Sequence, residues 1–224
     1  MDNHKFCFIM CVDDAFRAEE AIYYIRRLHV PENYSVDILS VTDAACMTSG
    51  YNEGMQASDA RYKIYIHQDV LILEKDMLYK LLGLFQNPDI GMVGVVGEAN
   101  PPVNGMVWFG GNIGKLYFQN MGSTILQEYA PAGNPYSTVA TIDGMFMATQ
   151  YDIPWREDIF GGWDFYDASQ SMEFHRRCLQ VIVPHQETPW CLHDGGVMNL
   201  KDYYSQRKIF VEEYQKELNS AIRW

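Results

Sequence analysis

Long apolar segments are missing from this sequence of 224 residues. No stretch approaches the roughly 20 apolar residues that a membrane-spanning helix needs. Residues 6–12 form the first apolar stretch, which is too short for a secretory signal and is followed by Asp13 and Asp14 instead of small residues. We therefore expect no membrane span and no signal peptide, and we interpret residues 6–12 as the first core strand.

Positive charge is also scarce. The chain has 17 lysine and arginine residues against 29 aspartate and glutamate residues, which gives a formal net charge of −12. A negative surface repels the phosphates of nucleic acids and gives no attraction to anionic lipids. We expect no nucleic-acid partner. An anionic small-molecule substrate would need a metal ion or helix N-termini to offset its charge.

Several common site motifs are absent as well. The sequence has no phosphate-binding P-loop, no Gly-x-Gly-x-x-Gly after the first strand and no Gly-x-Ser-x-Gly elbow. Its five cysteines are scattered and odd in number, and no two of them have the spacing of a zinc site. This pattern favours a reducing compartment, so we expect a cytoplasmic protein.

The first hundred residues alternate between strand and helix patterns. The predicted strands are residues 6–12, 36–41, a segment that ends at Asp69, and 90–96. Three helices are predicted: the first follows Asp13-Asp14 and ends near residue 28, and the other two cover residues 49–60 and 74–85. This alternation predicts an α/β fold with a Rossmann-like, mixed but mainly parallel central sheet and helices on both faces.

The pattern changes after residue 97. Residues 98–134 are rich in glycine, proline and asparagine, which predicts loops and short antiparallel strands over the ligand edge of the sheet. Further predicted elements are strands at 136–142, 145–149 and 181–183 and helices at 168–179 and 201–218. We expect one domain over residues 1–224. It would consist of a nucleotide-binding half (about 1–97), an acceptor-side half (about 98–200) and a C-terminal helix (about 201–224).

Residues 61–70 are the most informative segment, because an apolar strand pattern runs into His67-Gln68-Asp69. The C-terminal edge of an open α/β sheet is where ligands bind. Residues two apart on a strand point the same way, so His67 and Asp69 could share a metal ion. The alternative is a strand that ends in a polar turn.

Two later residues could join this site. Asp143 lies between two predicted strands and could line the same cleft, although Asp-Gly is also a strong hairpin-turn signal. His193 lies at a predicted strand end and could complete a metal site with Asp69. Its alternative role is that of an ordinary polar loop residue.

Residues 161–167 combine two glycines, three aromatic residues and two carboxylates just before a predicted helix. Asp167 could be the helix N-cap, or it could act as a general base if it reaches a substrate hydroxyl. Trp163, Phe165 and Tyr166 would offer flat faces to a sugar ring, although aromatic residues belong more often to a core.

These segments occur in an order that resembles a known family. The first strand ends in Asp13-Asp14, and residues 49–54 contain Asn52 ahead of the next strand. Residues 65–70 stand where the family places an Asp-x-Asp metal motif, Tyr166-Asp167 stands at its Glu-Asp acceptor motif, and His193 resembles its late histidine. The chain from about residue 5 to 196 thus resembles a family 2 glycosyltransferase of the GT-A (nucleotide-diphospho-sugar transferase) fold, nearest the StrF-like branch of streptomycin biosynthesis.

The sequence also departs from that pattern. His67 replaces the first acid of Asp-x-Asp, and Tyr166 replaces the glutamate before Asp167. The usual Pro-Thr-Tyr-Asn end of the first strand is replaced by residues 11–14. Because fewer acidic residues are left to bind a metal, the resemblance supports the predicted fold more strongly than the predicted activity.

The resemblance implies metal-dependent, inverting transfer of a sugar from a nucleotide-diphosphate donor, with UDP as the candidate nucleotide, to a hydroxyl of a carbohydrate or other acceptor. It implies Mn²⁺ or Mg²⁺ at Asp69, His67 and His193. It implies donor contacts at Asp13, Asp14, Asp43, Asn52, His67, Gln68 and Asp143. Asp167 would be the base, with Asp164 as the alternative, and Trp163, Phe165 and Tyr166 would contact the acceptor.

Two rival functions follow from the departures. A nucleotide- or sugar-binding protein of the same fold without transferase activity is the main alternative. A nucleotidyltransferase is disfavoured, because no glycine-rich basic loop follows the first strand. Residues 101–117 could form an acceptor lid or the surface of a homodimer.

Overall fold

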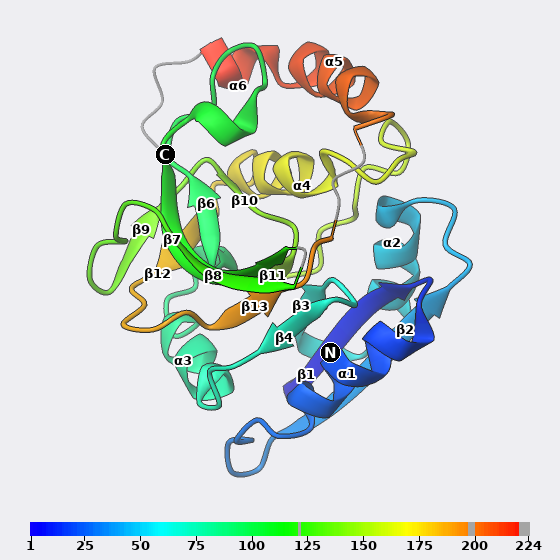
Figure 1. Ribbon diagram of the computed structural model, residues 1–224, viewed down its shortest axis with the longest axis vertical. Helices are drawn as coiled ribbons and strands as arrows, with labels where there is room; N and C mark the ends of the chain where they lie inside the picture. The colour runs from blue at the N-terminus through cyan, green and yellow to red at the C-terminus, as the bar shows by residue number, and fades with distance from the viewer. Residues whose placement is uncertain (121, 197–199, 220–224) are drawn as a thin grey trace.

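The computed structural model describes residues 1–120, 122–196 and 200–219 (Figure 1). A seven-stranded sheet has the order β2-β1-β3-β11-β5-β12-β9. Its strands are β1 (Asp2–Val12), β2 (Ser35–Thr42), β3 (Ala60–Ile66), β5 (Ile90–Gly94), β9 (Tyr136–Thr138), β11 (Phe146–Thr149) and β12 (Gln180–Pro184). Strand β1 is parallel to both β2 and β3, and β5 is parallel to β12. Strand β11 runs antiparallel between β3 and β5, and β9 runs antiparallel on the edge. The sheet is therefore mixed but mainly parallel, as predicted.

The side chains of β1 alternate between two hydrophobic cores. Phe6, Phe8 and Met10 pack on one side, with residues of α1 (Ala15–Ile25) and α3 (Met77–Leu84). Cys7 and Ile9 pack on the other side, with residues of α2 (Met47–Ala57) and α4 (Tyr166–His175). Because successive residues of a strand point to opposite faces, the apolar part of β1, residues 6–10, is buried on both sides. Helices cover both faces, as predicted.

A second, six-stranded sheet brings late residues beside the predicted site. Its order is β10-β6-β7-β13-β4, with β8 paired to β7. The strands are β4 (Val70–Ile72), β6 (Val96–Glu98), β7 (Asn112–Asn120), β8 (Ser123–Glu128), β10 (Thr141–Ile142) and β13 (Cys191–His193). Strand β13 is antiparallel to β4, so that His193 pairs with Val70. This pairing carries His193 to the turn that follows β3.

Several boundaries differ from the prediction. The strand predicted to end at Asp69 ends at Ile66, because Val70 N–H donates to the His67 carbonyl at 3.2 Å and closes a turn. The predicted strand at 90–96 is divided between β5 and β6, which belong to different sheets. Residues 98–134 contain the long hairpin of β7 and β8 in addition to loops and a short 3₁₀ helix, η1 (Val107–Phe109).

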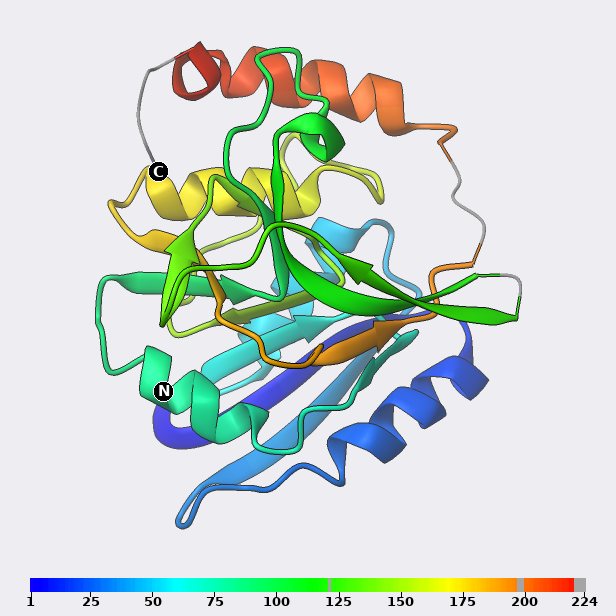
Figure 2. The same ribbon diagram turned by 60° about the vertical axis from the view of Figure 1, so that its left-hand side comes forward.

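The predicted C-terminal helix is two helices, α5 (Tyr203–Glu213) and α6 (Gln215–Asn219). They are divided at Tyr214, whose buried hydroxyl lies 2.8 Å from Ser169 Oγ and 3.1 Å from Glu173 Oε1. Both helices lie across α4, on the side away from the central sheet (Figures 1 and 2). Within the described residues, no helix combines the length and apolar character needed to cross a membrane.

Candidate active site

A cavity of about 540 Å³ lies where β1, β2 and β3 end. Its walls include Asp13 after β1, Asp43 after β2 and the His67-Gln68-Asp69 turn after β3. Trp163, from the loop before α4, also lines the cavity and is 51% exposed. The carboxyl ends of parallel strands are the usual ligand edge of such a sheet. The structure thus gathers around one cavity several residues that the sequence predicts for the donor site.

Gln68 ties the turn after β3 to the end of β1. Its Oε1 accepts hydrogen bonds from the backbone N–H groups of Asp13 at 3.1 Å and Asp14 at 2.9 Å, and its Nε2 donates to the Asp13 carboxylate. The Asp14 side chain caps α1 by accepting from the backbone N–H of Phe16 at 3.0 Å and of Arg17 at 3.3 Å. These bonds fix the edge of the cavity.

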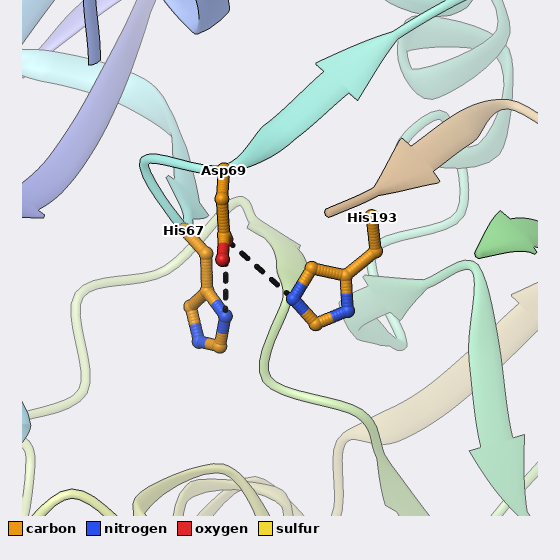
Figure 3. A group of neighbouring side chains, drawn as sticks. All are labelled: His67, Asp69 and His193. Atoms are coloured by element: carbon orange, nitrogen blue, oxygen red, sulfur yellow. Dashed lines mark ion pairs between the residues drawn. The ribbon is translucent and has the colours of Figure 1, made fainter. Parts of the chain in front are cut away.

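Three metal-ligating side chains converge beside this cavity (Figure 3). His67 follows β3, Asp69 precedes β4, and His193 ends β13. Asp69 Oδ1 lies 4.0 Å from His67 Nδ1 and 3.5 Å from His193 Nε2. One ligand atom from each residue lies within 4.8 Å of the others. One divalent ion could therefore contact all three residues.

The chemistry of Asp69 fits such an ion. Its Oδ1 is buried and has no hydrogen-bond partner among the residues that the structure describes. Its Oδ2 lies 3.4 Å from Arg17 Nη1, which also donates to the Asp194 carbonyl at 3.3 Å. A buried carboxylate oxygen without a hydrogen bond is destabilising, and coordination would remove that cost. Two imidazoles with one carboxylate suit Mn²⁺ better than Mg²⁺, which prefers oxygen ligands.

Burial and charge act differently on the three residues. Burial, together with the nearby His193, lowers the pKa of His67 to about 4. Burial opposes protonation of His193 too, but Asp69, Asp143 and Asp194 outweigh it and raise the pKa of His193. Burial alone would raise the pKa of Asp69, but the interactions with His193 and His67 outweigh it and lower that pKa. These shifts favour neutral His67 and ionised Asp69, which are the forms that bind metals, whereas His193 would lose a proton on binding one.

The second ring nitrogen of His67, Nε2, contacts the hydroxyl of Tyr166, the first residue of α4. Tyr166 is 5% exposed, and its ring packs near those of Tyr51 and Trp155. Gly144 leaves room for it, because a Cβ at Gly144 would collide with the Tyr166 hydroxyl oxygen. Tyr166, predicted to offer a ring face to the acceptor, is instead buried and reaches the metal-ligating cluster through its hydroxyl.

Asp167 follows Tyr166 in the first turn of α4. Its Oδ2 accepts from Gly144 N–H at 2.8 Å and its Oδ1 from Ala168 N–H at 2.7 Å. Burial, followed by the negative charge of Asp143, raises the pKa of Asp167 to about 7. A pKa near the working pH suits a general base. The alternative role of N-cap falls to Phe165, which precedes the helix.

Asp143 lies in the connection between β10 and β11. Strand β10 pairs with β6, and β11 pairs with β3 and β5, so the connection is not a hairpin turn. Asp143 Oδ1 accepts from Met145 N–H at 3.0 Å. Its negative charge favours protonation of His67, His193 and Asp167. Asp143 therefore acts on the site through its charge.

Asp164, the predicted alternative base, and Phe165, a predicted acceptor contact, lie in different surroundings. Asp164 is partly buried, and burial followed by the charge of Asp202 raises its pKa. Phe165 is 4% exposed and packs against Tyr203 and Phe210 with ring centroids 5.0 and 5.2 Å away. Phe165 thus belongs to the core under α5, where its ring cannot meet a sugar, and the prediction for it needs correction.

Asn52, predicted to contact the donor, makes its hydrogen bonds inside the protein. Its Nδ2 donates to the Trp155 carbonyl at 3.0 Å, and its Oδ1 accepts from the Trp155 N–H at 2.8 Å. The side chain is 5% exposed. Asn52 therefore supports the loop before α4, while its neighbour Tyr51 lines the cavity.

Arg17 is a site residue that the sequence analysis missed. It lies three residues after Asp14, with Nε 3.7 Å from Asp14 Oδ2, so helical spacing could have placed it near the first-strand aspartates. No local signal indicates its contacts with Asp69 and Asp194, because these residues come from distant parts of the sequence. Tyr51 was also missed, although it directly precedes Asn52 in the sequence.

Comparisons with known proteins bear on the family and the fold of this chain. The model of a family described as "Glycosyltransferase like family" matches residues 7–214. The fold is similar to mannosyltransferase PcManGT from Pyrobaculum calidifontis in complex with GDP-Man and Mn²⁺, with a TM-score of 0.62 and 10% identity. It is also similar to S. aureus TarS in complex with UDP-GlcNAc (TM-score 0.61, 10% identity). A third similar structure is a Drosophila β-1,4-galactosyltransferase 7 mutant in complex with manganese, UDP-Gal and xylobiose (0.51, 17%).

The solved structures are longer than this chain. The alignment with the mannosyltransferase covers 100% of this chain but 66% of that protein. For TarS, 97% of this chain aligns with 67% of the UDP-GlcNAc complex and with 40% of a longer TarS chain. For the galactosyltransferase the shares are 89% and 73%. A search of curated proteins found no match.

Proposed function

We propose that this chain, which belongs to the glycosyltransferase-like family and has the GT-A fold of its structural neighbours, transfers a sugar from a nucleotide-diphosphate donor to an acceptor hydroxyl. The observation that carries the proposal is the cluster of His67, Asp69 and His193, in which Asp69 Oδ1 faces both imidazoles. The cluster lies at the sheet edge where β1, β2 and β3 form a cavity of about 540 Å³.

The cavity would hold the nucleotide. Asp13 and Asp43 lie on its wall and can accept hydrogen bonds from base or ribose, and Gln68 keeps Asp13 in place. We propose UDP as the nucleotide, although the neighbours bind both GDP-linked and UDP-linked sugars. These carboxylates attract no phosphate, so the diphosphate must find positive charge at the end of the cavity.

His67, Asp69 and His193 would hold Mn²⁺, with Mg²⁺ as the weaker alternative. When bound, the ion offsets the negative charge that develops on the departing nucleotide diphosphate. Arg17 holds Asp69 Oδ2, which leaves Oδ1 directed toward the imidazoles. A second, more open hollow, lined by residues 13–17 and Gln68, adjoins the cavity. Among the described residues that line the cavity or this hollow, Arg17 alone carries a full positive charge, and we propose that it also contacts a phosphate oxygen.

Asp167 would act as the general base. Each of its oxygens accepts one backbone hydrogen bond and keeps a second lone pair for an acceptor hydroxyl. As the hydroxyl oxygen attacks the anomeric carbon, its proton passes to Asp167. The bond from that carbon to the diphosphate oxygen breaks, and its electron pair leaves with the nucleotide. One direct displacement inverts the anomeric configuration. Asp164 is the alternative base.

The acceptor is proposed to be a carbohydrate or another hydroxyl compound. We propose that Trp163, which lines the cavity and is about half exposed, contacts the acceptor. We also propose membership of the StrF-like branch, because the chain keeps His-Gln-Asp where most of the family has Asp-x-Asp. The proposed location is the cytoplasm, in keeping with five unbridged cysteines. A homodimer also remains a proposal.

Calorimetry with a panel of nucleotide sugars, with and without Mn²⁺, followed by transfer and hydrolysis assays, tests this function. We expect Mn²⁺-dependent binding and turnover of one donor class, and loss of both in Asp69→Asn. Asp76→Asn is the matched control, because Asp76 pairs with His29 at 2.7 Å on the surface. Mn²⁺-dependent donor binding without turnover of any donor would favour the rival, a binding protein of the same fold.

A further inference from the structure

The two departures from the family motifs are in contact. His67 replaces the first acid of the metal motif and Tyr166 replaces the glutamate of the acceptor motif, 99 positions apart in the sequence. In the structure the Tyr166 hydroxyl meets His67 Nε2. Since each residue occupies a position where an acid is expected, the contact suggests that the two replacements serve one purpose.

The orientation of His67 indicates what that purpose is. Its Nδ1 faces Asp69 Oδ1 at 4.0 Å, inside the metal-ligating cluster, and its Nε2 faces Tyr166. A neutral imidazole carries one proton and one ring lone pair, so Nδ1 can bind a cation only when the proton is on Nε2. That Nε2–H needs a buried acceptor, and a tyrosine hydroxyl can accept it.

Tyr166 is held firmly enough to orient a partner. The side chain is 5% exposed and begins α4, and Gly144 closes on its hydroxyl, where even a methyl group would collide. Asp167, the next residue, is anchored by Gly144 N–H at 2.8 Å and Ala168 N–H at 2.7 Å. The Tyr166 hydroxyl therefore keeps its position against His67, because the backbone of Gly144 and the start of α4 are held together by the Asp167 side chain.

We propose that Tyr166 is a positioning residue for the metal centre: its hydroxyl accepts the Nε2 proton of His67 and thereby presents the Nδ1 lone pair to the divalent ion. The inference rests on the proposed function, since it requires an ion at His67, Asp69 and His193. Tyr166 would then link the two parts of the proposed site, because it contacts the proposed metal ligand His67 and directly precedes the proposed base Asp167. Partners of metal-ligating histidines act in this way in other metal sites.

The first test is the affinity for Mn²⁺ alone, measured by electron paramagnetic resonance. We expect Tyr166→Phe to weaken Mn²⁺ binding by about 10- to 100-fold, the range for loss of such a partner. Tyr214→Phe is the matched control, because it removes a buried hydroxyl that contacts Ser169 and Glu173 of the same helix, away from His67 and the cavity. We expect this control to keep the wild-type Mn²⁺ affinity.

A second variant guards against a folding defect in Tyr166→Phe. Gly144→Ala introduces a methyl group that displaces the Tyr166 hydroxyl without altering any metal ligand. We expect it to weaken Mn²⁺ binding in the same way. Thermal unfolding of each variant shows whether the chain is folded when the affinity is measured.

The second test reads the tautomer of His67 directly. Long-range ¹H–¹⁵N spectra of the imidazole rings, recorded with Mg²⁺ or Zn²⁺, should show the His67 proton on Nε2 in the wild type. A proton on Nδ1 in the loaded protein, or equal Mn²⁺ affinities of wild type and Tyr166→Phe, would overturn the positioning role alone. If the wild type binds no divalent ion, the metal centre of the proposed function fails, and this inference fails with it.

Discussion

Replacing Asp167 with asparagine should impair catalysis and make folding less sensitive to pH. Burial and Asp143 raise the pKa of Asp167 from 3.8 to about 7. A carboxyl whose folded-state pKa is raised binds more protons in the folded than in the unfolded chain between these values. Its contribution to stability is therefore present at low pH and lost as the pH rises toward 7.

The size of this loss follows from the two pKa values. Between pH 5 and pH 8 the Asp167 carboxyl should reduce the free energy of unfolding by about 2–3 kcal/mol, at about 1.36 kcal/mol for each pKa unit. An asparagine side chain cannot titrate, so Asp167→Asn should lack this decline. The new amide leaves one of the Gly144 and Ala168 N–H groups without an acceptor, which lowers stability by about 1–3 kcal/mol at every pH. The difference between variant and wild type should thus move in favour of the variant as the pH rises.

Catalysis should change in the opposite sense. The base must be ionised, so kcat/KM of the wild type should rise with pH through a midpoint near 7. Asp167→Asn should reduce transfer by about 10²–10⁴-fold, as loss of a general base does. Urea unfolding from pH 5 to 8 and initial rates with the proven donor measure the two effects.

Two further variants separate Asp167 from its neighbours. Asp143→Asn removes a charge that raises the pKa of Asp167, so the rate midpoint should shift to lower pH. Asp164→Asn should leave that midpoint in place if Asp164 is not the base. The reasoning is refuted if Asp167→Asn retains wild-type transfer, or if its unfolding free energy follows the same pH dependence as that of the wild type.

Three other outcomes are expected. Chelation should abolish turnover, and Mn²⁺ should restore it better than Mg²⁺; equal rescue by both ions would contradict a metal site with two imidazole ligands. His193→Ala should raise the Mn²⁺ dissociation constant by more than about 10-fold. Arg17→Gln should weaken binding of the nucleotide diphosphate at saturating Mn²⁺ by about 10-fold, and unchanged calorimetric affinity would exclude a phosphate contact. Asn52→Ala should lower the free energy of unfolding by about 2–4 kcal/mol, because both Trp155 backbone groups lose their hydrogen-bond partner. The variant should keep the wild-type donor affinity, and a weaker affinity in the folded variant would show that Asn52 contacts the donor.

The strands and helices of the central sheet could be predicted because local sequence patterns specify them. The apolar residues 6–10 of β1 are buried on both faces, and Asp14 caps the following helix, so strand and helix follow from neighbouring residues. The second sheet was not readable in the same way. Its β4 and β13 are three residues each, and β13 pairs with both β4 and β7, which are long-range contacts that no local pattern reports.

In the candidate site, too, local relations could be predicted from the sequence and long-range contacts could not. His67 and Asp69 could be paired from their spacing, since one turn carries both. His193 entered only as a candidate at a strand end, and β13 places it opposite Val70. Phe165 was misassigned because an aromatic residue in a glycine-rich loop gives no sign that α5 will cover it. The contact of Tyr166 with His67 depends on the packing of α4 and on Gly144, and sequence spacing contains neither.

The charges around His67 and Tyr166 explain why neutral residues suit both positions. Asp143 already helps to raise the pKa of Asp167 to about 7, and Asp69 adds a further negative charge to the cluster. Acids at 67 and 166 would add further negative charge close to Asp167. An imidazole keeps a metal-binding nitrogen at position 67, and a hydroxyl keeps a hydrogen-bonding group at position 166, without more negative charge. Under the proposed function, the two replacements would thus keep a donor atom for the ion at position 67 without adding negative charge beside the base at Asp167.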